Sequence, residues 1–580
     1  MPSPRIQLQL PLSLLVVLLC GCAAATAKDE AAATAVEAAP ADAAAQSPKV
    51  SLGTPQEEAQ YHVMAGEMAA GRQRPDIAAR EFLQALDVLS DAPLAARATA
   101  LALAANDDAL ALQAARKWQS LDTTSLDARE VVTRLALRAG QNEEAYQQCA
   151  SIVRDHPGGI DDGFHHVALL LEQEPGKADE ALALMDRLVT QYPKQAGAYR
   201  AQSLLALRYG KIDLAEHAAR EALQLKPSKE ASLMLVASLV KKGDVAGADQ
   251  VMDGVLKNNA DAKDIRLGYA KLLIEADQHA HARDELEKVL KDDPGNAEAH
   301  YSLGLLALDD QQLDEAEAHF QTLQHKSDHQ NEAEYFLGRI AESRHQPRQA
   351  LAHYEKVTNG QEALDAAVHR AAMLAKLGKV EEARTLLESM REQFPPLSER
   401  FLMAEGEILL DAGAFDDALK LYEQALKDTP ENNDILYSRS LVYERMSRVG
   451  DAEADLRKIL AQAPDDARAL NALGYTLTVH TDRLDEADKL VSRALELTPD
   501  DPAVIDSMGW LRFRQGRPQD ALPLLQKAYA RFPDAEVAAH LGEVLWTLGD
   551  KDKAQSVLSR ASKTDPDNTQ LRDTLKRLGI

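Results

Sequence analysis

The sequence predicts an all-α protein, a solenoid of stacked helical hairpins. One motif returns about every 34 residues, and aromatic residues make up only 4 % of the chain. Between the motifs, apolar residues recur at spacings of three and four, which is typical of amphipathic helices. A period of this length indicates a repeat array. The array replaces the three to five separate domains that 580 residues would otherwise suggest.

Composition excludes several classes of protein. Hydrophobic residues are 45 % and charged residues 27 % of the chain, which is too apolar for general disorder. The net charge is −27, so DNA and RNA are poor partners, because phosphate binding needs a basic surface. Cys149 is the one cysteine outside the N-terminal segment, so it has no partner for an internal disulfide or a cysteine-based metal site.

Residues 1–21 are predicted to be a signal peptide. Arg5 supplies a positive charge near the start, and an apolar stretch follows over residues 12–19. This stretch is too short to span a bilayer as a helix, which takes about 20 residues. It has the length of the apolar region of a signal peptide.

The signal peptide ends in Leu19-Cys20-Gly21-Cys22, which resembles a bacterial lipobox. In a lipobox a small residue precedes the cysteine that receives the lipid. Gly21 fits this position, whereas Leu19 is too large, so we expect Cys22 to be lipidated. The alternative is an ordinary secretory signal that is cleaved within the alanines at 23–25.

Residues 22–48 are predicted to be the lipidated cysteine and a flexible Ala-rich tether. The stretch contains Pro40 and Pro48 and no aromatic residue. A flexible chain of this length reaches roughly 25–30 Å on average. Several acyl chains on one cysteine anchor a protein stably where a single chain would be marginal. The lipobox resemblance, with Ala at position 23, implies a lipid-anchored protein of the outer membrane that faces the periplasm.

An alanine that follows acidic or polar residues marks each unit of the array. Its 13 clear occurrences are 33 to 36 residues apart, and Ala78 and Ala111 extend the same phase upstream. We expect this alanine to let the two helices of a hairpin approach closely. The markers are Ala145, Ala181, Ala215, Ala248, Ala282, Ala316, Ala350, Ala383, Ala418, Ala452, Ala487, Ala521 and Ala554.

Glycine and proline stand at fixed distances from the marker alanine. Proline follows twelve residues later in most units, and it ends the second helix or opens the next because it has no N–H to donate. Glycine precedes the marker by five residues in eight units, where a left-handed backbone can end the first helix. These glycines are Gly140, Gly176, Gly210, Gly243, Gly378, Gly413, Gly516 and Gly549.

The unit at 399–432 shows every part of the pattern. Gly406 stands at the close crossing of the two helices, Gly413 at the turn and Ala418 at the marker, and Tyr422 follows. This combination of period, Gly, Ala and Pro resembles the tetratricopeptide repeat. The resemblance implies about 14 helical hairpins in a right-handed superhelix with a concave inner groove. A single hairpin cannot bury its apolar face, so neighbouring hairpins must stabilise one another.

The array covers nearly all of the chain after the tether. We expect N-terminal and central tetratricopeptide repeats over 55–395 and C-terminal repeats over 396–580. The stretch 467–560 resembles the C-terminal repeats of Gram-negative tetratricopeptide lipoproteins, and among these the pseudomonad adaptors of a periplasmic carboxyl-terminal processing protease.

This resemblance implies a non-enzymatic adaptor. Its partners would be the periplasmic PDZ-type serine protease, which it binds and activates, and the peptidoglycan hydrolases that it presents as substrates. One alternative is a scaffold for envelope assembly, serving polysaccharide export, a pilus or secretin, or peptidoglycan synthases. Another is an enzyme with a hidden site.

No catalytic motif stands out. The chain lacks G-x-S-x-G, H-E-x-x-H, the Walker loop and the dinucleotide fingerprint, so we expect no enzyme activity, no cofactor and no metal. His319, His325 and His329 are the densest ligand-like group, but they fall where a second helix should end, which favours solvated loop residues. Cys149 stands four residues after Ala145 and is expected to be a small buried hydrophobe.

Seven residues of the C-terminal repeats are candidates for a protein-binding groove. We expect the residues three before, one after and four after the close-crossing glycine of a first helix to face inward. Two of the three tryptophans are among them, and aromatic side chains dominate binding hot spots. Two alternatives stay open, an exposed aromatic groove and tryptophans packed between repeats. The candidates are Asn471, Tyr475, Asp506, Trp510, Phe513, Glu543 and Trp546.

Three arginines form a local basic cluster in this acidic chain. They are expected either to meet a carboxylate of a partner or to balance nearby aspartates. The arginines are Arg512, Arg514 and Arg517, and the aspartates are Asp500, Asp501 and Asp506.

Overall fold

The computed structural model describes most of the chain after the predicted tether. The predicted signal peptide, Cys22 and the tether lie outside the described residues. The described ranges are 53–257, 262–325, 328–566 and 568–580.

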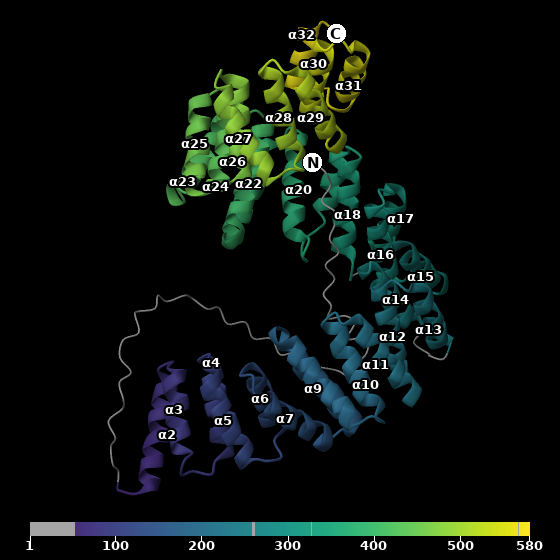
Figure 1. The fold of residues 1–580 in the computed structure, drawn as a ribbon. Coiled ribbons are helices and arrows are strands. Elements are labelled where there is room, and N and C mark those ends of the chain that lie inside the picture. The colour runs from purple at the N-terminus through teal and green to yellow at the C-terminus, as the bar shows by residue number, and fades with distance from the viewer. Residues whose placement is uncertain (1–52, 258–261, 326–327, 567) are drawn as a thin grey trace. The chain divides into compact units, whose positions relative to one another are not determined.

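Every regular element in these ranges is a helix, and the helices pair into hairpins (Figure 1). The even-numbered helices α2 to α30 are the first, or A-helices, and the odd-numbered helices α3 to α31 are the second, or B-helices. The bounds are α2 Pro55–Gly71, α3 Pro75–Ala85, α4 Ala92–Ala104, α5 Asp108–Leu121, α6 Leu126–Arg138, α7 Asn142–Asp155, α8 Ile160–Glu172, α9 Ala178–Gln191, α10 Ala196–Arg208, α11 Ile212–Leu225, α12 Lys229–Lys242, α13 Val245–Lys257, α14 Ala262–Glu275, α15 His279–Asp292, α16 Ala297–Asp309, α17 Leu313–Leu323, α18 Gln330–Ser343, α19 Pro347–Tyr354, α20 Ala363–Lys376, α21 Val380–Gln393, α22 Ser398–Asp411, α23 Phe415–Asp428, α24 Asn433–Arg445, α25 Val449–Gln462, α26 Ala467–His480, α27 Leu484–Leu497, α28 Pro502–Arg514, α29 Pro518–Arg531, α30 Ala535–Thr547, α31 Lys551–Thr564 and α32 Thr569–Leu578, with short 3-10 turns η1 Pro175–Lys177 and η2 Pro395–Leu397.

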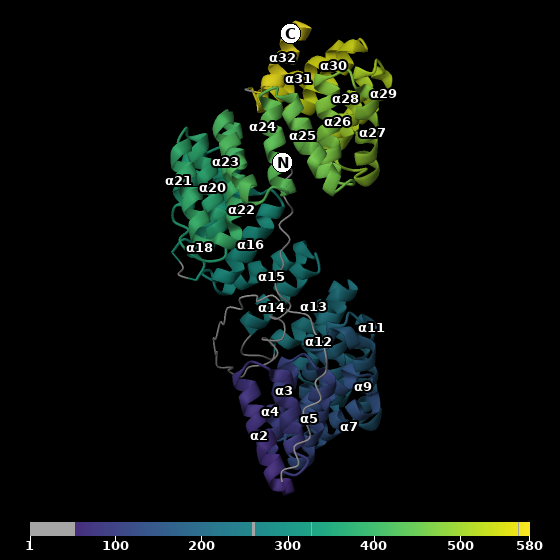
Figure 2. The same ribbon diagram turned by 90° about the vertical axis from the view of Figure 1, so that its left-hand side faces the viewer.

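The chain divides into two compact units between Ala299 and His300, a point inside α16. The first unit holds the seven hairpins α2 to α15, and the second holds the eight hairpins α16 to α31 and the last helix α32. Within each unit, consecutive helices lie side by side in chain order (Figures 1 and 2). The predicted division between 395 and 396 falls at η2 and stays a prediction.

The predicted all-α hairpin solenoid is confirmed. The described residues form fifteen hairpins, where the sequence predicted about 14. The weaker signals at Ala78 and Ala111 mark true hairpins, α2–α3 and α4–α5. Both residues and all 13 clear markers are fully buried, as expected for a small residue at the contact between two helices.

The close crossing predicted at Gly406 is present. A Cβ added to Gly406 in α22 would overlap the ring of Tyr422 in α23. The same relation recurs in other hairpins, where a Cβ at Gly304 would lie 2.7 Å from the Phe320 ring. Such a contact is closer than real Cβ atoms allow, so a larger side chain here would push the helices apart.

The turn between A- and B-helix uses a left-handed residue five positions before the marker, as predicted. Seven of the eight predicted glycines adopt it, with φ between 69° and 90°. Gly176 does not, and that prediction was wrong. Gly176 lies in the 3-10 turn η1, in the hairpin whose marker Ala181 follows the preceding marker Ala145 after 36 residues, the longest interval of the array. Six hairpins place another residue type at this position, with φ between 54° and 60°: Gln73, Asn106, Asp277, Gln311, His345 and Ser447.

Side chains cap many A-helices. The carboxylates of Asp466 and Asp501 accept backbone N–H groups of the first turns of α26 and α28, and Asn432 does the same for α24. Caps of this kind satisfy N–H groups that have no partner inside the helix. None of the helices in the described part of the chain combines the length and apolar character that crossing a bilayer requires.

Alanine substitutions can test the roles of Gly406 at the crossing and Gly413 at the turn, with Gly450 as the control. Gly406→Ala should destabilise α22–α25 by about 1–3 kcal/mol through overlap with Tyr422. Gly413→Ala should cost about 1 kcal/mol, because alanine resists the left-handed backbone at φ 71°. Gly450→Ala should be neutral or slightly stabilising, since a Cβ there meets nothing within 4 Å.

Hydrogen exchange of α22–α25 is the measurement for this series, because repeat arrays do not always unfold as one unit. Equal effects of the three substitutions would contradict the roles assigned to Gly406 and Gly413.

Candidate binding surfaces

The seven groove candidates lie on three consecutive A-helices, and the last helix α32 packs against α30. Asn471 and Tyr475 are on α26. Asp506, Trp510 and Phe513 are on α28, and Glu543 and Trp546 are on α30.

Trp510 packs inside the array. Its side chain is 7 % exposed, and its ring stacks on His540 of α30 with 4.2 Å between the centroids and 18° between the planes. The ring of Phe513 is tilted by 32° from that of Trp510, at a centroid distance of 5.1 Å. Of the two alternatives that the sequence left open, Trp510 therefore matches a tryptophan packed between repeats and not an exposed groove residue.

The stacked ring of His540 also forms a buried pair with Asp506. The Nδ1 atom of His540 lies 2.9 Å from Asp506 Oδ2, and its Nε2 atom lies 2.8 Å from Gln570 Nε2 of α32. Burial alone would lower the pKa of His540, but the carboxylates of Asp506, Glu536 and Glu543 raise it above its usual value. Because both ring nitrogens are engaged and the ring is covered, the pair joins helices rather than offering a base to solvent.

Tyr475 also bonds across the repeats. Its hydroxyl donates to a carboxylate oxygen of Glu536, which links α26 to α30 past the intervening α28. Burial, and then the Glu536 carboxylate, raise the pKa of Tyr475 strongly. Two buried oxygens nearby, Asn471 Oδ1 and Asp506 Oδ1, accept no hydrogen bond from the described residues.

Five candidates keep part of their surface open. Asn471 and Tyr475 on α26 are half-buried, and so are Phe513, Glu543 and Trp546 on α28 and α30. Glu543 accepts a hydrogen bond of 2.7 Å from Arg577 of α32, and the ammonium of Lys551 lies 4.8 Å from the Trp546 ring centroid. Phe513, Glu543 and Trp546 form an edge of the predicted groove that a partner can reach without rearrangement, whereas Trp510 and Asp506 are buried.

Three residues that complete the network were missed by the sequence reasoning. His540 and Glu536 of α30 and Gln570 of α32 stand away from the positions expected to face inward. Spacing offers a partial signal for His540, because it precedes Gly542 by two residues. In α18 the residue at this position, Phe336, stacks on Phe320 of the preceding repeat.

The basic cluster is balanced locally, but not by the aspartates that the sequence suggested. Arg512 donates to Asp488 at 2.6 Å, Arg517 to Asp520 at 2.7 Å, and Arg514 to the backbone carbonyl of Val479 at 3.1 Å. The predicted partners lie elsewhere. Asp500 and Asp501 lie at the opposite end of α28, and Asp506 faces His540. A helix of this length separates its two ends by about 18 Å.

The histidine group does not converge. His325 and His329 fall between α17 and α18, as expected, and His325 is exposed. His319 Nδ1 lies 2.9 Å from His300 Nδ1, while the ring of His329 stacks on Tyr301. Across the described ranges, no three His, Cys, Asp or Glu residues are grouped to hold a metal ion.

Cys149 is fully buried, as the sequence predicted for a small hydrophobe. Burial raises the pKa of its thiol to about 12, so the thiolate is scarce at neutral pH.

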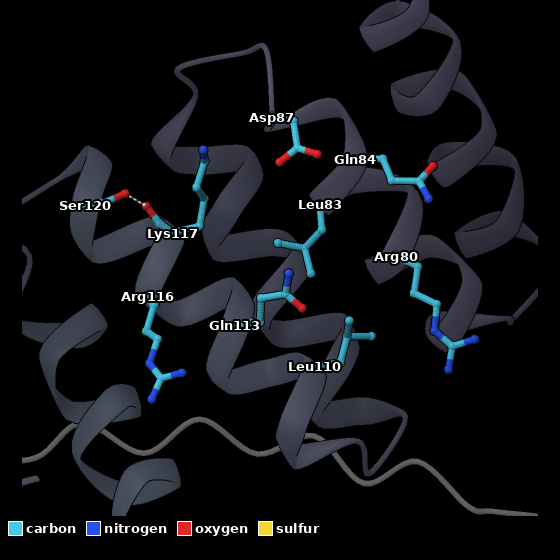
Figure 3. A pocket seen from close by; sticks show the side chains of 9 residues that line it. All are labelled: Arg80, Leu83, Gln84, Asp87, Leu110, Gln113, Arg116, Lys117 and Ser120. Carbon is cyan, nitrogen blue, oxygen red and sulfur yellow. Dashed lines mark hydrogen bonds between the residues drawn. The ribbon is translucent and has the colours of Figure 1, made fainter. Parts of the chain in front are cut away.

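A pocket of about 490 Å³ lies between α3 and α5 in the first unit (Figure 3). Three cationic side chains and one carboxylate line it, although the chain as a whole is acidic. Arg116 is held by Glu144 at 2.9 Å, and Arg80 lies 3.7 Å from Asp107. Two of the three cations are therefore already paired with carboxylates, and Asp87 adds a negative charge to the lining beside Lys117. Its lining is Arg80, Leu83, Gln84, Asp87, Leu110, Gln113, Arg116, Lys117 and Ser120.

The buried Asp506–His540 pair predicts a pH dependence for the last repeats. The pKa of His540 is raised on folding, so the pair stabilises fully below the unfolded value of about 6.5. That contribution, about 1–3 kcal/mol, should be lost as the pH rises through the folded pKa.

The measurement is urea unfolding at a series of pH values, followed by fluorescence in a Trp118→Phe background. The signal then comes from Trp510 and Trp546. Asp506→Asn should flatten the pH dependence; an unchanged profile in this variant would argue against the pair.

Comparison with known proteins finds family models that match several stretches of the array. Models described as "Tetratricopeptide repeat" match residues 409–474 and 512–578, and residues 170–230 and 270–331. A model of the N-terminal tetratricopeptide region of Psidin matches residues 341–439.

Two curated proteins and two solved structures are similar to parts or most of the chain. The human protein O-mannosyl-transferase TMTC1 is 26 % identical over 30 % of this chain and 20 % of its own length. The Cut9–Hcn1 structure covers 90 % of this chain and 96 % of its own at 15 % identity and a TM-score of 0.32. TTC0263 of Thermus thermophilus covers 31 % of this chain and 98 % of its own at 22 % identity and a TM-score of 0.29.

The remaining relative extends over most of both proteins. The TPR repeat-containing protein PA4667 of Pseudomonas aeruginosa is 36 % identical over 499 residues, which are 85 % of this chain and 83 % of that protein. With the repeat geometry described above, this likeness shows that the chain belongs to the family of tetratricopeptide-repeat proteins.

Proposed function

We propose that this protein is a non-enzymatic adaptor anchored in the outer membrane through lipidated Cys22. It binds and activates a periplasmic carboxyl-terminal processing protease and presents peptidoglycan hydrolases to it. As a tetratricopeptide-repeat protein the chain is a scaffold for protein interactions; the identity of its partners and the anchor are the proposal.

The observation that carries the proposal is the uninterrupted array. From α2 to α31 the described helices all belong to hairpins of one kind, and α32 closes the last one. An array of this length offers separate surfaces to two partners at once. Holding both on one chain raises the concentration of one partner around the other, which speeds their encounter without a new contact.

Two surfaces suit two partners. We assign substrate binding to the edge formed by Phe513, Glu543 and Trp546, where half-buried aromatic side chains can gain contact area at low entropic cost. We assign protease binding to the first unit, where the ammonium of Lys117 in the pocket between α3 and α5 offers a cation to a carboxylate of the partner. The buried Trp510 packs against Phe513 and so supports the first surface.

Capture from cell envelopes tests the two assignments together. Wild-type protein should retain a PDZ-type serine protease and peptidoglycan hydrolases. The Trp546→Ala/Phe513→Ala variant should lose hydrolases at least about tenfold while keeping the protease. The Lys117→Glu variant should instead lose the protease at least about tenfold while keeping the hydrolases.

Leu497→Ala is the matched control, since Leu497 is an exposed apolar residue at the end of a B-helix, outside both surfaces. Retention of a secretin or a peptidoglycan polymerase in place of the protease would instead support the envelope-assembly alternative.

The anchor is tested at its one cysteine. Cys22→Ala should prevent lipidation and move the protein from the outer-membrane fraction to the soluble periplasm, because the net charge of −27 disfavours binding to an anionic surface. Cys20→Ala is the control and should leave the protein in the membrane. Membrane association of Cys22→Ala would contradict the assigned lipidation site.

A further inference from the structure

α2, the first helix among the described residues, carries an apolar face that no other described helix covers. Tyr61, Met64 and Met68 are 44 %, 67 % and 56 % exposed, and they lie on the side of α2 opposite to its contact with α3. Exposed methionines on one helical stripe are unusual on a monomer surface and mark a contact site. Figure 1 shows α2 at the edge of the first unit, beside α3.

The same three positions are buried in later A-helices. Relative to the close-crossing residue they stand five before, two before and two after. At these positions α18 places Ala333, Phe336 and Ile340, and α28 places Val504, Ser507 and Leu511, none more than 8 % exposed. Both helices pack there on the preceding B-helix, α17 or α27. The face of α2 is therefore built to receive an antiparallel helix, and no described helix precedes α2.

The last helix shows the opposite design. α32 buries Leu571 and Thr574, and its exposed residues are polar or charged, among them Arg572, Asp573 and Lys576. Terminal repeats with a polar outer face keep a repeat array soluble. The contrast indicates that the face of α2 is covered when the protein acts.

We propose that a second copy of this chain covers it, through antiparallel pairing of α2 with α2. A twofold axis between Met64 and Ala65 sets Tyr61 of one chain against Met68 of the other. The same axis sets exposed Glu57 against exposed Arg72 of the other chain, twice. The parallel alternative would set each charge against its like.

The pairing is self-complementary, as twofold contacts require. Three large apolar side chains make a small interface, so the dimer is weak and depends on concentration. This inference does not depend on the proposed partners or on the anchor.

Sedimentation velocity of the full chain over a concentration series tests the proposal. Wild-type protein should pass from monomer to dimer in the micromolar range. Met64→Glu should raise the dissociation constant at least about tenfold, while Leu225→Glu, a change at an exposed leucine at the end of α11, should not.

A charge exchange separates self-pairing from other occupants. Arg72→Glu should weaken the dimer, because the carboxylate of Glu57 would then face a second carboxylate across the axis. Glu57→Lys/Arg72→Glu should restore it. Glu57→Lys removes the capping box with Thr54, so thermal melting of each variant checks that α2 still folds.

Three outcomes would overturn the proposal. One is a wild-type chain that stays monomeric throughout the series. Another is a double exchange that fails to restore the dimer while the melting temperature is unchanged. The third is a Met64→Cys variant that crosslinks, under oxidation in cells, only to a different protein or to the chain's own residues 22–48 rather than to a second copy.

Discussion

The structure depends on a fixed, close distance between the two helices of each hairpin. The fully buried marker alanine sets this distance on the B-helix, and the crossing residue of the A-helix meets the side chain four residues after the marker. The sizes of these two residues compensate. Gly406 faces Tyr422, whereas Thr133 and Cys149, or Ser203 and Ala219, occupy the same two positions. Cys149 is small because its partner position is not glycine, which is a packing reason and needs no role for the thiol.

Because the distance is shared, the turn is shared too. The backbone N–H of Ala414 donates to the carbonyl of Leu409, and the N–H of Arg448 donates to Tyr443 in the same way, although the left-handed residue is Gly413 in one turn and Ser447 in the other. A serine in this conformation costs about 1 kcal/mol more than glycine. Stacking of the flanking helices supplies that energy, so glycine favours the turn without being required for it.

The close helix contact and the shared turn explain which parts of the structure could be predicted from the sequence. Period, marker and turn are local features, so the hairpins, the buried alanines and most left-handed turns follow from spacing alone. The contacts among the groove candidates do not follow from spacing, because they depend on how successive A-helices are placed relative to one another. The bond from Tyr475 to Glu536 passes over α28, and no pattern within one repeat specifies it. Trp510, one residue after Gly509, is buried against His540 of the next repeat, whereas Trp546, four residues after Gly542, keeps an open edge.

The two ends of a repeat array are where such differences have the largest effect. Each hairpin gains stability from its neighbours, so a terminal hairpin has half the support of an internal one. At the C-terminal end, α32 supplies that support through Gln570 and Arg577, which reach His540 and Glu543. No described helix gives α2 the equivalent support, and the side chains of Met64 and Met68, which would contact such a helix, are exposed. A binding partner that docks on α2 adds the missing neighbour, so binding there and the folding of the first repeats are coupled by necessity.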